Sequence, residues 1–325
     1  MDPANHNVKY ERLENNIAEH SPKLSHRAMP VGRPGLLLWR QFKRLLELKN
    51  LLTANILFLL VNLFFLVMQL RQGFWPVETY FQPTMTDNDR VMLMRTVRDF
   101  SRSLDQHNIT YFMYGGTLIG SYRHHGPIPW DDDVDVIVSA SQRQKLQNVL
   151  DSLRPQYDVY VPSSVSAVAT PQWKFYANAL SKFIHAPFKW PYIDIFFFAE
   201  NDTHIWDDNP KYANHYIFPK SQVFPLVRRP FGELMLPSPC DPLAILQRNY
   251  NIALCRSKQF NHAKEIPVFS FQTKDVPCER LRNYFPFVYR SFANGLVNET
   301  LILGEWILNN IVLPAQCNAA RAWHR

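Results

Sequence analysis

The chain has little glycine and no closely spaced cysteine pair. Only 10 of its 325 residues are glycine, whereas 24 are proline, a composition that favours fixed loops over flexible linkers. The four cysteines all fall in the last third, and the lack of any CxxC spacing argues against a zinc site. In an oxidising compartment, one or two disulfides are expected in any of three pairings, with buried free thiols as the alternative. The residues concerned are Cys240, Cys255, Cys278 and Cys317.

Charged residues are also few. They make up 19% of the sequence against 46% hydrophobic residues, so most of the chain can bury a core. The sequence has no internal repeat and no low-complexity tract. Much of the net charge of +7 lies in a basic block just before residue 50, and no basic stripe follows it. A nucleic-acid partner is therefore not expected.

One segment, Leu51–Leu70, contains no charged residue at all. About 20 apolar residues in a helix span a hydrocarbon layer of roughly 30 Å, which predicts a transmembrane helix. A buried core helix is the alternative, although such helices are usually shorter and amphipathic. A cleaved signal peptide does not fit, because the segment starts far from residue 1 and lacks a small-residue cleavage site.

The basic residues around this segment predict its orientation. Five precede it, and after Arg71 the next one is Arg90. Under the positive-inside rule the N-terminus is cytosolic and the chain after residue 71 is lumenal, which is a type II signal anchor in the Golgi or ER membrane. Three glycosylation sequons, at Asn108, Asn201 and Asn298, agree with a lumenal glycoprotein. The five preceding residues are Arg33, Arg40, Lys43, Arg44 and Lys49.

Hydrophobic spacing beyond the anchor predicts alternating helices and strands. Tyr192–Ala199, the most apolar stretch after the anchor, is expected to be a central strand. Further strands are expected at Ile109–Tyr114 and Asp133–Val138. Helices are expected at 87–107, Thr117–Tyr122, Ser139–Leu153, Pro242–Tyr250 and, as an amphipathic helix, Leu296–Leu313.

Four acids crowd into the segment Trp130–Asp135. Side chains alternate across a strand, so Asp131, Asp133 and Asp135 can share one face, where they would repel one another. A divalent cation between them removes that repulsion, and oxygen ligands suit Mg²⁺ or Mn²⁺. A solvated acidic loop is the alternative. The apolar residues on both sides argue against such a loop, since they belong to core elements.

A further acid, Asp194, interrupts the apolar strand Tyr192–Ala199. A charge buried in such a strand needs a partner of opposite sign. The cation already inferred for the acidic segment supplies one, which makes Asp194 a candidate third ligand. A structural salt bridge is the alternative.

A glycine turn precedes the acids by fifteen residues. Gly115, Gly116 and Thr117 follow a predicted strand and begin a helix, a place where backbone amides can approach phosphate closely. Arg123 can neutralise a diphosphate, because its guanidinium binds phosphate oxygens in a fork. Lys174 is a weaker phosphate candidate.

The ungapped stretch from Gly115 to Val136, with its motif WDDDVD, resembles the signature of the LicD/fukutin family. The resemblance covers roughly residues 88–255 and implies an α+β, nucleotidyltransferase-like fold, with a mixed sheet flanked by helices. It also implies transfer of a phospho-alcohol, such as phosphocholine or ribitol phosphate, from a CDP-linked donor to a glycan. The cysteine zinc element of fukutin-related protein is not visible here.

The resemblance assigns roles to the candidate residues. Asp133 and Asp135 would hold the metal with Asp194 as third carboxylate, and Asp131 would be a further ligand or a neighbour of the ligands. The glycine turn would hold the donor phosphates, and Arg123 would stabilise developing charge. Either Asp194 or Asp131 would take the proton of the acceptor hydroxyl.

The expected organisation is a membrane-anchored phosphotransferase. Two alternatives remain at this point: a catalytically silent lumenal protein that binds glycans or enzymes, and a nucleotidyltransferase that acts on a sugar phosphate. The expected segments are a cytosolic tail (1–50), a signal anchor (51–70), a stem (71–86), a catalytic domain (87–255) and a C-terminal extension (256–325).

Overall fold

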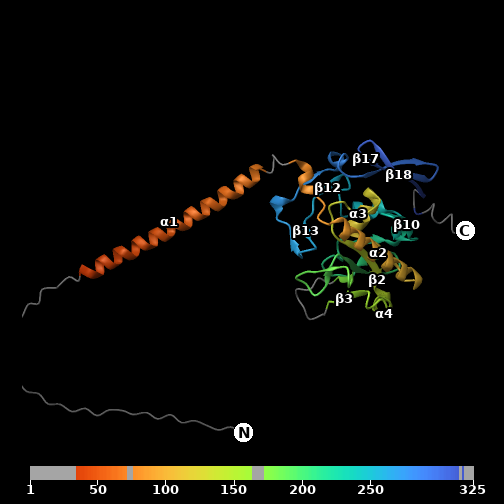
Figure 1. Ribbon diagram of the computed structural model, residues 1–325, viewed down its shortest axis with the longest axis horizontal. Coiled ribbons are helices and arrows are strands. Elements are labelled where there is room, and N and C mark those ends of the chain that lie inside the picture. The colour runs from red at the N-terminus through yellow and green to blue at the C-terminus, as the bar shows by residue number, and fades with distance from the viewer. Residues whose placement is uncertain (1–33, 72–75, 163–171, 315–316, 318–325) are drawn as a thin grey trace, which may run out of the picture. The chain divides into compact units, whose positions relative to one another are not determined.

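The computed structural model describes residues 34–71, 76–162, 172–314 and 317 (Figure 1). The chain divides into two compact units, residues 1–66 and 67–325. Residues 1–33 of the predicted cytosolic tail and residues 72–75 of the predicted stem lie outside the described residues.

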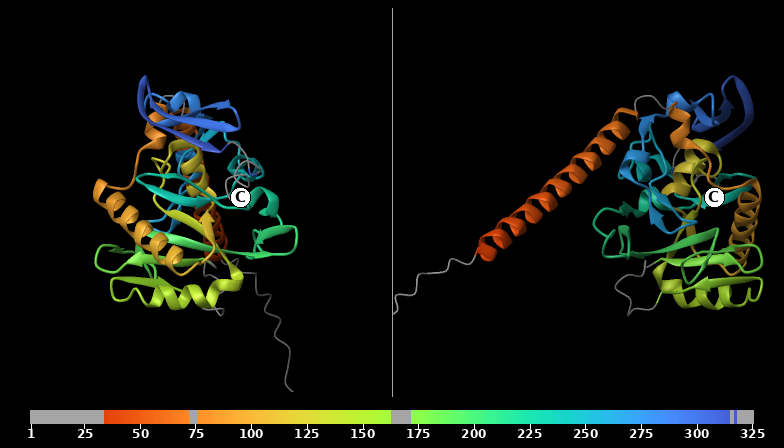
Figure 2. Two further views of the ribbon diagram at one scale, coloured as in Figure 1. Left: turned by 90° about the vertical axis from the view of Figure 1, so that its right-hand side faces the viewer. Right: turned by 60° about the vertical axis from the view of Figure 1, so that its left-hand side comes forward.

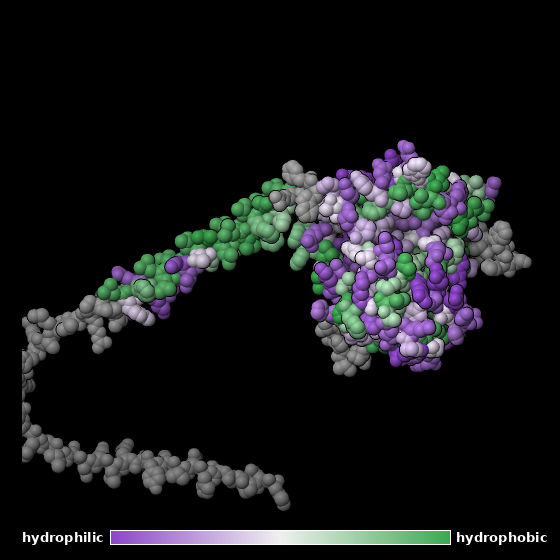
Figure 3. Space-filling view, viewed as in Figure 1, coloured by the Kyte–Doolittle hydropathy of each residue, from purple (hydrophilic) through white to green (hydrophobic). Residues whose placement is uncertain are grey.

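Helix α1 spans Pro34–Arg71, and within its segment Leu38–Met68 an 18-residue window has a mean hydropathy of 2.4, with none of that window buried. By length and composition this helix can cross a membrane, and Figure 3 shows hydrophobic residues along most of it. The predicted span 51–70 lies within it. Two polar side chains of the apolar segment form hydrogen bonds within the helix. Thr53 and Asn62 each donate to the backbone carbonyl four residues earlier, at 2.7 Å.

The second unit is built on a seven-stranded mixed sheet with β7 in its middle. Strands β2 and β7 pair in parallel, and the other pairs of this sheet are antiparallel. The prediction of a central strand at Tyr192–Ala199 is confirmed. The strands are β1 (Tyr111–Met113), β2 (Val134–Ser139), β3 (Tyr157–Tyr160), β4 (Trp173–Ala177), β7 (Tyr192–Glu200), β8 (His204–Asp207) and β9 (Ile217–Pro219).

Helices cover this sheet (Figure 2). α2 (Asp87–Gln106) packs on β4, β7 and α4, while α3 (Gly115–His124) packs on β2 and α6. α2 begins with a capping box, in which the Thr86 hydroxyl accepts from the Asp89 amide and the Asp89 carboxylate accepts from the Thr86 amide. The other short helices are η1 (Val77–Phe81), η2 (Ala140–Gln142), α4 (Arg143–Asp151), α5 (Lys220–Val223) and α6 (Pro242–Gln247).

The remaining strands form small sheets outside the main one. They are β5 (Lys182–Phe183) with β6 (Lys189–Trp190), β10 (Val227–Phe231) with β11 (Leu234–Ser238), β12 (Leu254–Arg256) with β15 (Asp275–Pro277), β13 (Phe260–Asn261) with β14 (Ile266–Pro267), and β16 (Phe287–Ala293) with β17 (Leu296–Leu303) and β18 (Trp306–Pro314). Two 3-10 turns, η3 (Ser270–Gln272) and η4 (Cys278–Leu281), connect some of them.

The predicted amphipathic helix at Leu296–Leu313 is wrong, because this segment is the β17–β18 hairpin. Gly304 adopts a φ of +59° between the two strands, a left-handed conformation that ends a regular element and favours glycine. Val297 and Glu299, two residues apart, are both buried, so the burial follows the period of a strand rather than that of a helix.

The four cysteines form two disulfides, Cys240–Cys317 and Cys255–Cys278. This selects one of the three possible pairings and excludes the alternative of free thiols. Both bonds join the region before residue 256 to the C-terminal extension, so they link the predicted catalytic domain to its extension.

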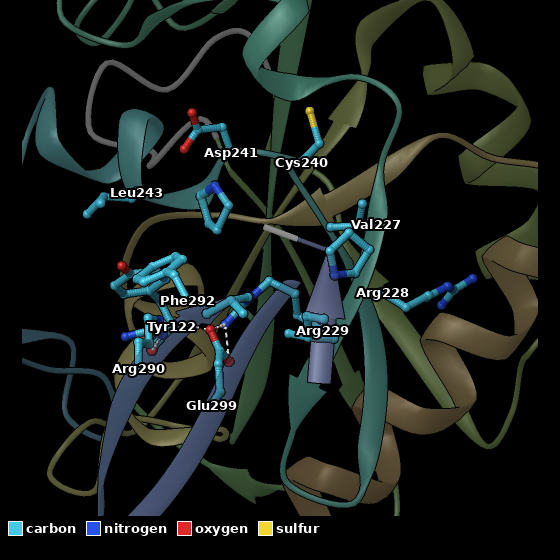
Figure 4. A pocket seen from close by; sticks show the side chains of 14 residues that line it. Tyr122, Val227, Arg228, Arg229, Cys240, Asp241, Leu243, Arg290, Phe292 and Glu299 are labelled. Atoms are coloured by element: carbon cyan, nitrogen blue, oxygen red, sulfur yellow. Dashed lines mark hydrogen bonds and ion pairs between the residues drawn. The ribbon is translucent and has the colours of Figure 1, made fainter. Parts of the chain in front are cut away.

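A buried ionic cluster attaches β17 to the end of α3. The Glu299 carboxylate accepts hydrogen bonds from Arg229 at 2.7 Å and Arg290 at 2.8 Å (Figure 4). It also lies 2.8 Å from His125 Nε2. Burial raises the pKa of Glu299, but these three partners lower it more, to about 2. Beside the cluster is a cavity of about 260 Å³, lined by Tyr122 among others.

Candidate active site

The glycine turn brings the backbone of α3 against two carboxylates. Gly115 has a φ of +49°, and a Cβ there would lie 3.0 Å from Asp135 Oδ2. A Cβ on Gly116 would lie 3.1 Å from Asp131 Oδ2. A Cβ at either position would therefore make a tight contact with a carboxylate oxygen, and the left-handed conformation of Gly115 also favours glycine.

Thr117 is buried beneath the same turn. Its hydroxyl accepts a hydrogen bond from the Asp135 amide at 2.7 Å, and the Tyr114 amide donates to the Asp135 carbonyl at 3.1 Å. Both backbone groups of Asp135 are thus held from α3 and from the residue before it, which fixes the start of β2 relative to the helix.

Three carboxylates meet beside this turn. Parallel pairing of β2 with β7 places Asp135 opposite Asp194, and Asp133 completes the group. One oxygen of each lies within 4.8 Å of the other two. β2 begins only at Val134, so Asp131 and Asp133 reach the cluster from the loop before the strand rather than from the strand itself.

Burial and mutual repulsion shift the pKa values of these acids. Burial raises the pKa of Asp135 to about 7, and repulsion from Asp194 and Asp131 adds to the effect. The pKa values of Asp133 and Asp131 are also raised, first by burial. These three carboxylates could hold a metal ion, which would remove their mutual repulsion.

Asp194 also has a cationic partner. Lys174 Nζ lies 2.6 Å from Asp194 Oδ1, and the lysine side chain is 3% exposed, with Nζ 4.2 Å from the centre of the Tyr192 ring. The sequence left two alternatives for Asp194, a metal ligand or a partner in a structural salt bridge. In the structure Asp194 belongs both to the carboxylate group and to a salt bridge. In this structure Lys174 contacts the cluster from within the sheet, and its ammonium is paired.

Asp132 points to a different set of partners. Its carboxylate, fully buried, forms ion pairs with Lys258 and with His262, whose Nδ1 is 2.7 Å away. His262 Nε2 also lies 3.1 Å from Asp133 Oδ2. Burial lowers the pKa of His262, but Asp133 and Asp132 raise it more, to about 10. Sequence reasoning missed Lys258 and His262, because nothing in their local sequence links them to acids about 130 residues earlier.

Arg123 lies beside the acids without contacting the carboxylate group. Its Nη1 donates to the Leu254 carbonyl at 3.2 Å and lies 3.3 Å from Cys278 Sγ, with the guanidinium over the Trp130 ring. Burial lowers the pKa of Arg123 to about 10. The neighbouring His124 is also buried, which lowers its pKa to about 3, and its Nδ1 bonds the backbone at Pro286.

Two cavities adjoin the acids, with Tyr250 in the wall of both. The larger, about 280 Å³, has Arg123 and Asp131 among its lining residues. The smaller, about 140 Å³, is lined by Gly115, Gly116, Asp135 and five aromatic residues. Those aromatics are Tyr114, Phe196, Tyr212, Tyr216 and Tyr250.

The part of the chain that forms this site also matches a known protein family in sequence. Residues 108–241 match the LicD/FKTN/FKRP nucleotidyltransferase domain. This part of the chain belongs to the LicD family. The matched region holds β1 through β11, including the glycine turn and all four acids of the site, so the LicD domain carries the candidate active site.

Several known proteins are similar to parts of the chain. An uncharacterized protein of Rickettsia prowazekii is 28% identical over 162 residues, 49% of this chain and 53% of its own. The lipopolysaccharide cholinephosphotransferase LicD of Haemophilus influenzae is 36% identical over 66 residues, 20% of this chain and 25% of its own. The chain spans about half the length of the curated relatives it matches over the longest stretch.

Among solved structures, a lincomycin-bound lincosamide antibiotic adenylyltransferase is similar at 17% identity. The similarity covers 51% of this chain and 87% of that one, with a TM-score of 0.32. A terminal uridylyl transferase of Trypanosoma brucei with bound GTP is similar over 34% of this chain and 31% of its own, at 14% identity and a TM-score of 0.22.

Proposed function

We propose that this protein is a metal-dependent phosphotransferase that moves a phospho-alcohol from a CDP-linked donor to a glycan. The observation that carries the proposal is the group of Asp133, Asp135 and Asp194 beside a glycine turn that begins a helix. Membership of the LicD family supports the reaction class.

The chain's own residues supply the binding of the donor. The first backbone amides of α3 have no hydrogen-bond partner within the helix, and the N-terminus of a helix favours anions. The Gly115–Gly116 turn, which begins α3, can therefore bind donor phosphates. The absence of side chains at these two positions lets the turn lie close to Asp135 and Asp131. Arg123 supplies a buried positive charge to the larger cavity. A cation bound by the three carboxylates would stabilise negative charge on the phosphoryl oxygens.

The proposed reaction breaks one bond and forms another at phosphorus. The acceptor hydroxyl attacks the phosphorus that carries the alcohol, the bond to CMP breaks, and CMP leaves with that bond's electrons. We assign the acceptor proton to Asp131. Of the two candidates, Asp194 is already paired with Lys174, whereas Asp131 lines the larger cavity and has a raised pKa, as a proton acceptor requires.

The proposed setting is the lumen of the Golgi or ER, with α1 as a type II signal anchor. The basic residues before and within the first part of α1 support a cytosolic N-terminus. The two disulfides support an oxidising compartment for the LicD domain and its extension.

The test is to incubate the purified full chain with Mg²⁺ or Mn²⁺ and a panel of CDP-alcohols. Release of CMP from one of them, dependent on the metal, would identify the reaction and the transferred alcohol. Release of pyrophosphate from a nucleoside triphosphate plus a sugar phosphate would instead indicate a nucleotidyltransferase. If the folded protein released neither product, the silent binding protein would be favoured.

A further inference from the structure

A loop of the C-terminal extension lies against the acid cluster. The disulfide Cys255–Cys278 joins its two ends, and the ladders β12–β15 and β13–β14 fold it back on itself. The loop lies beyond the LicD match at 108–241, and the function proposed above assigns no role to its residues.

Two side chains of the loop bind the acidic segment. Lys258 and His262 both pair with Asp132, whose side chain is 0% exposed, while those of Lys258 and His262 are 9% and 18% exposed. A buried carboxylate without partners is strongly unfavourable, so these two residues determine where Asp132 can lie.

His262 also links Asp132 to the metal group. Its Nδ1 is 2.7 Å from Asp132 Oδ1, and its Nε2 is 3.1 Å from Asp133 Oδ2, so one imidazole ring spans two consecutive acids. This ring fixes the side chain of Asp133, which is one of the three carboxylates close enough to share a cation. Groups that orient metal ligands in this way usually contribute to the affinity of the site.

The loop is attached to the LicD domain at further points. The Trp130 indole donates to the Arg256 carbonyl at 2.9 Å, next to Asp131. The Tyr192 hydroxyl donates to the carboxylate of Glu265, and Tyr192 lies two residues before Asp194 in β7. The loop therefore contacts both chain segments that contribute acids to the cluster.

We infer that the disulfide-closed loop 255–278 is a working part of the metal site, in which Lys258 and His262 are positioning residues for Asp132 and Asp133. This inference rests on the proposed metal site. It extends the site to residues beyond the LicD match and makes the affinity for a divalent cation depend on the Cys255–Cys278 bond.

The disulfide matters because the loop has little structure of its own. Its two ladders are two or three residues long, and its ends are 23 residues apart in sequence. Short isolated hairpins are marginally stable, so an uncrosslinked loop would sample many conformations in which its lysine and histidine do not reach the acids.

The first experiment measures binding of Mn²⁺ to the full chain in detergent by electron paramagnetic resonance, which requires no donor. Lys258→Met and His262→Gln are each expected to weaken Mn²⁺ binding by roughly tenfold or more. Lys264→Met is the matched control, because it removes an exposed lysine of the same loop and should bind Mn²⁺ like the wild type. Lys258→Arg should restore most of the affinity, since it keeps the positive charge.

The second experiment replaces each disulfide in turn. The pair Cys255→Ser with Cys278→Ser should lower Mn²⁺ affinity, whereas Cys240→Ser with Cys317→Ser should not, because that bond does not close the loop. All variants are compared below their thermal unfolding midpoints. Folded Lys258→Met and His262→Gln proteins with wild-type Mn²⁺ affinity would overturn the inference, as would equal losses in the two disulfide variants.

These outcomes separate the inference from the proposed function. If no CDP-alcohol reacts but Mn²⁺ binds and depends on Lys258 and His262, the inference stands and the reaction is wrong. If CMP is released and Mn²⁺ binding does not depend on the loop, the reaction stands and the inference is wrong. A wild-type chain that binds no Mn²⁺ would overturn the metal site and the inference together.

Discussion

Asp131, Asp132 and Asp133 are consecutive, yet their side chains have three different surroundings. Asp131 lies over Gly116 and lines the larger cavity, Asp132 is fully buried between two cations, and Asp133 joins the carboxylate group. The backbone turn before β2 separates them, so each can have a different role although their chemistry is the same.

Replacing Asp135 with asparagine should remove activity while leaving the fold intact. Asp135→Asn keeps the shape of the side chain but removes one of the charges that a cation needs, so CMP release should fall by roughly 10²- to 10³-fold. The thermal unfolding midpoint should not fall, because the substitution relieves repulsion from Asp194 and Asp131. Asp151→Asn, at an exposed acid of α4, is the control. Normal turnover in Asp135→Asn would contradict the metal assignment.

Gly115→Ala should impair activity through a steric contact. Its new Cβ would lie 3.0 Å from Asp135 Oδ2 in a residue with φ +49°. Gly295→Ala is the matched control, since Gly295 has a φ of +71° with nothing within 4 Å of an added Cβ. Both variants should lose about 1 kcal/mol of stability from the backbone conformation. Only Gly115→Ala should also lose CMP release; equal activity in the two variants would show that the turn has no role in catalysis.

At the scale of elements, the site is assembled by pairings that are remote in sequence. The parallel contact of β2 with β7 brings Asp135 and Asp194 together, and the start of α3 is held against the same place by Thr117. The hairpin β17–β18 is attached at the far end of α3 through Glu299. α3 therefore links the acid site at its beginning to the C-terminal sheet at its end.

The Glu299 cluster predicts acid-sensitive stability. Its folded-state pKa of about 2 lies below the ordinary value of 4.5, so the stabilisation is complete above pH 4.5 and is lost as pH falls toward 2. The shift corresponds to about 3 kcal/mol for this buried group. In thermal unfolding between pH 6 and pH 2.5, Glu299→Gln should start less stable and show a weaker pH dependence. Glu305→Gln, at an exposed position in the same hairpin, should behave like the wild type.

At the scale of the whole molecule, one apolar helix and one LicD domain with a disulfide-linked extension account for most of the described residues. By its length and composition the helix can cross a membrane. The proposed topology follows from the helix and its flanking charges together.

Removing residues 1–71 should release the remaining chain from membranes. In cell fractionation with alkaline carbonate, the full chain should stay in the membrane pellet and the shortened chain, given a secretory signal, should appear in the soluble fraction. Treatment of the full chain with an endoglycosidase should increase its mobility, and Asn201→Gln should reduce that change, because Asn201 is exposed. An unglycosylated chain with a cytosolic C-terminus would contradict the lumenal assignment.

The sequence by itself determined the features that depend on neighbouring residues. The apolar helix, the strand predicted at Tyr192–Ala199 and the glycine turn all follow from local spacing and backbone preference, and the structure contains each of them. The acids of the cluster were also found in this way, because carboxylates so close together are unusual between apolar core segments.

Only the tertiary structure decided the features that depend on contacts across the chain. The partners of Asp132 come from Lys258 and His262, the disulfide pairing was one of three, and Leu296–Leu313 forms strands because β16 pairs with it. The physical reason is the same in each case. A buried charge, a cysteine or an apolar segment requires a partner, but which partner reaches it depends on how the whole chain folds.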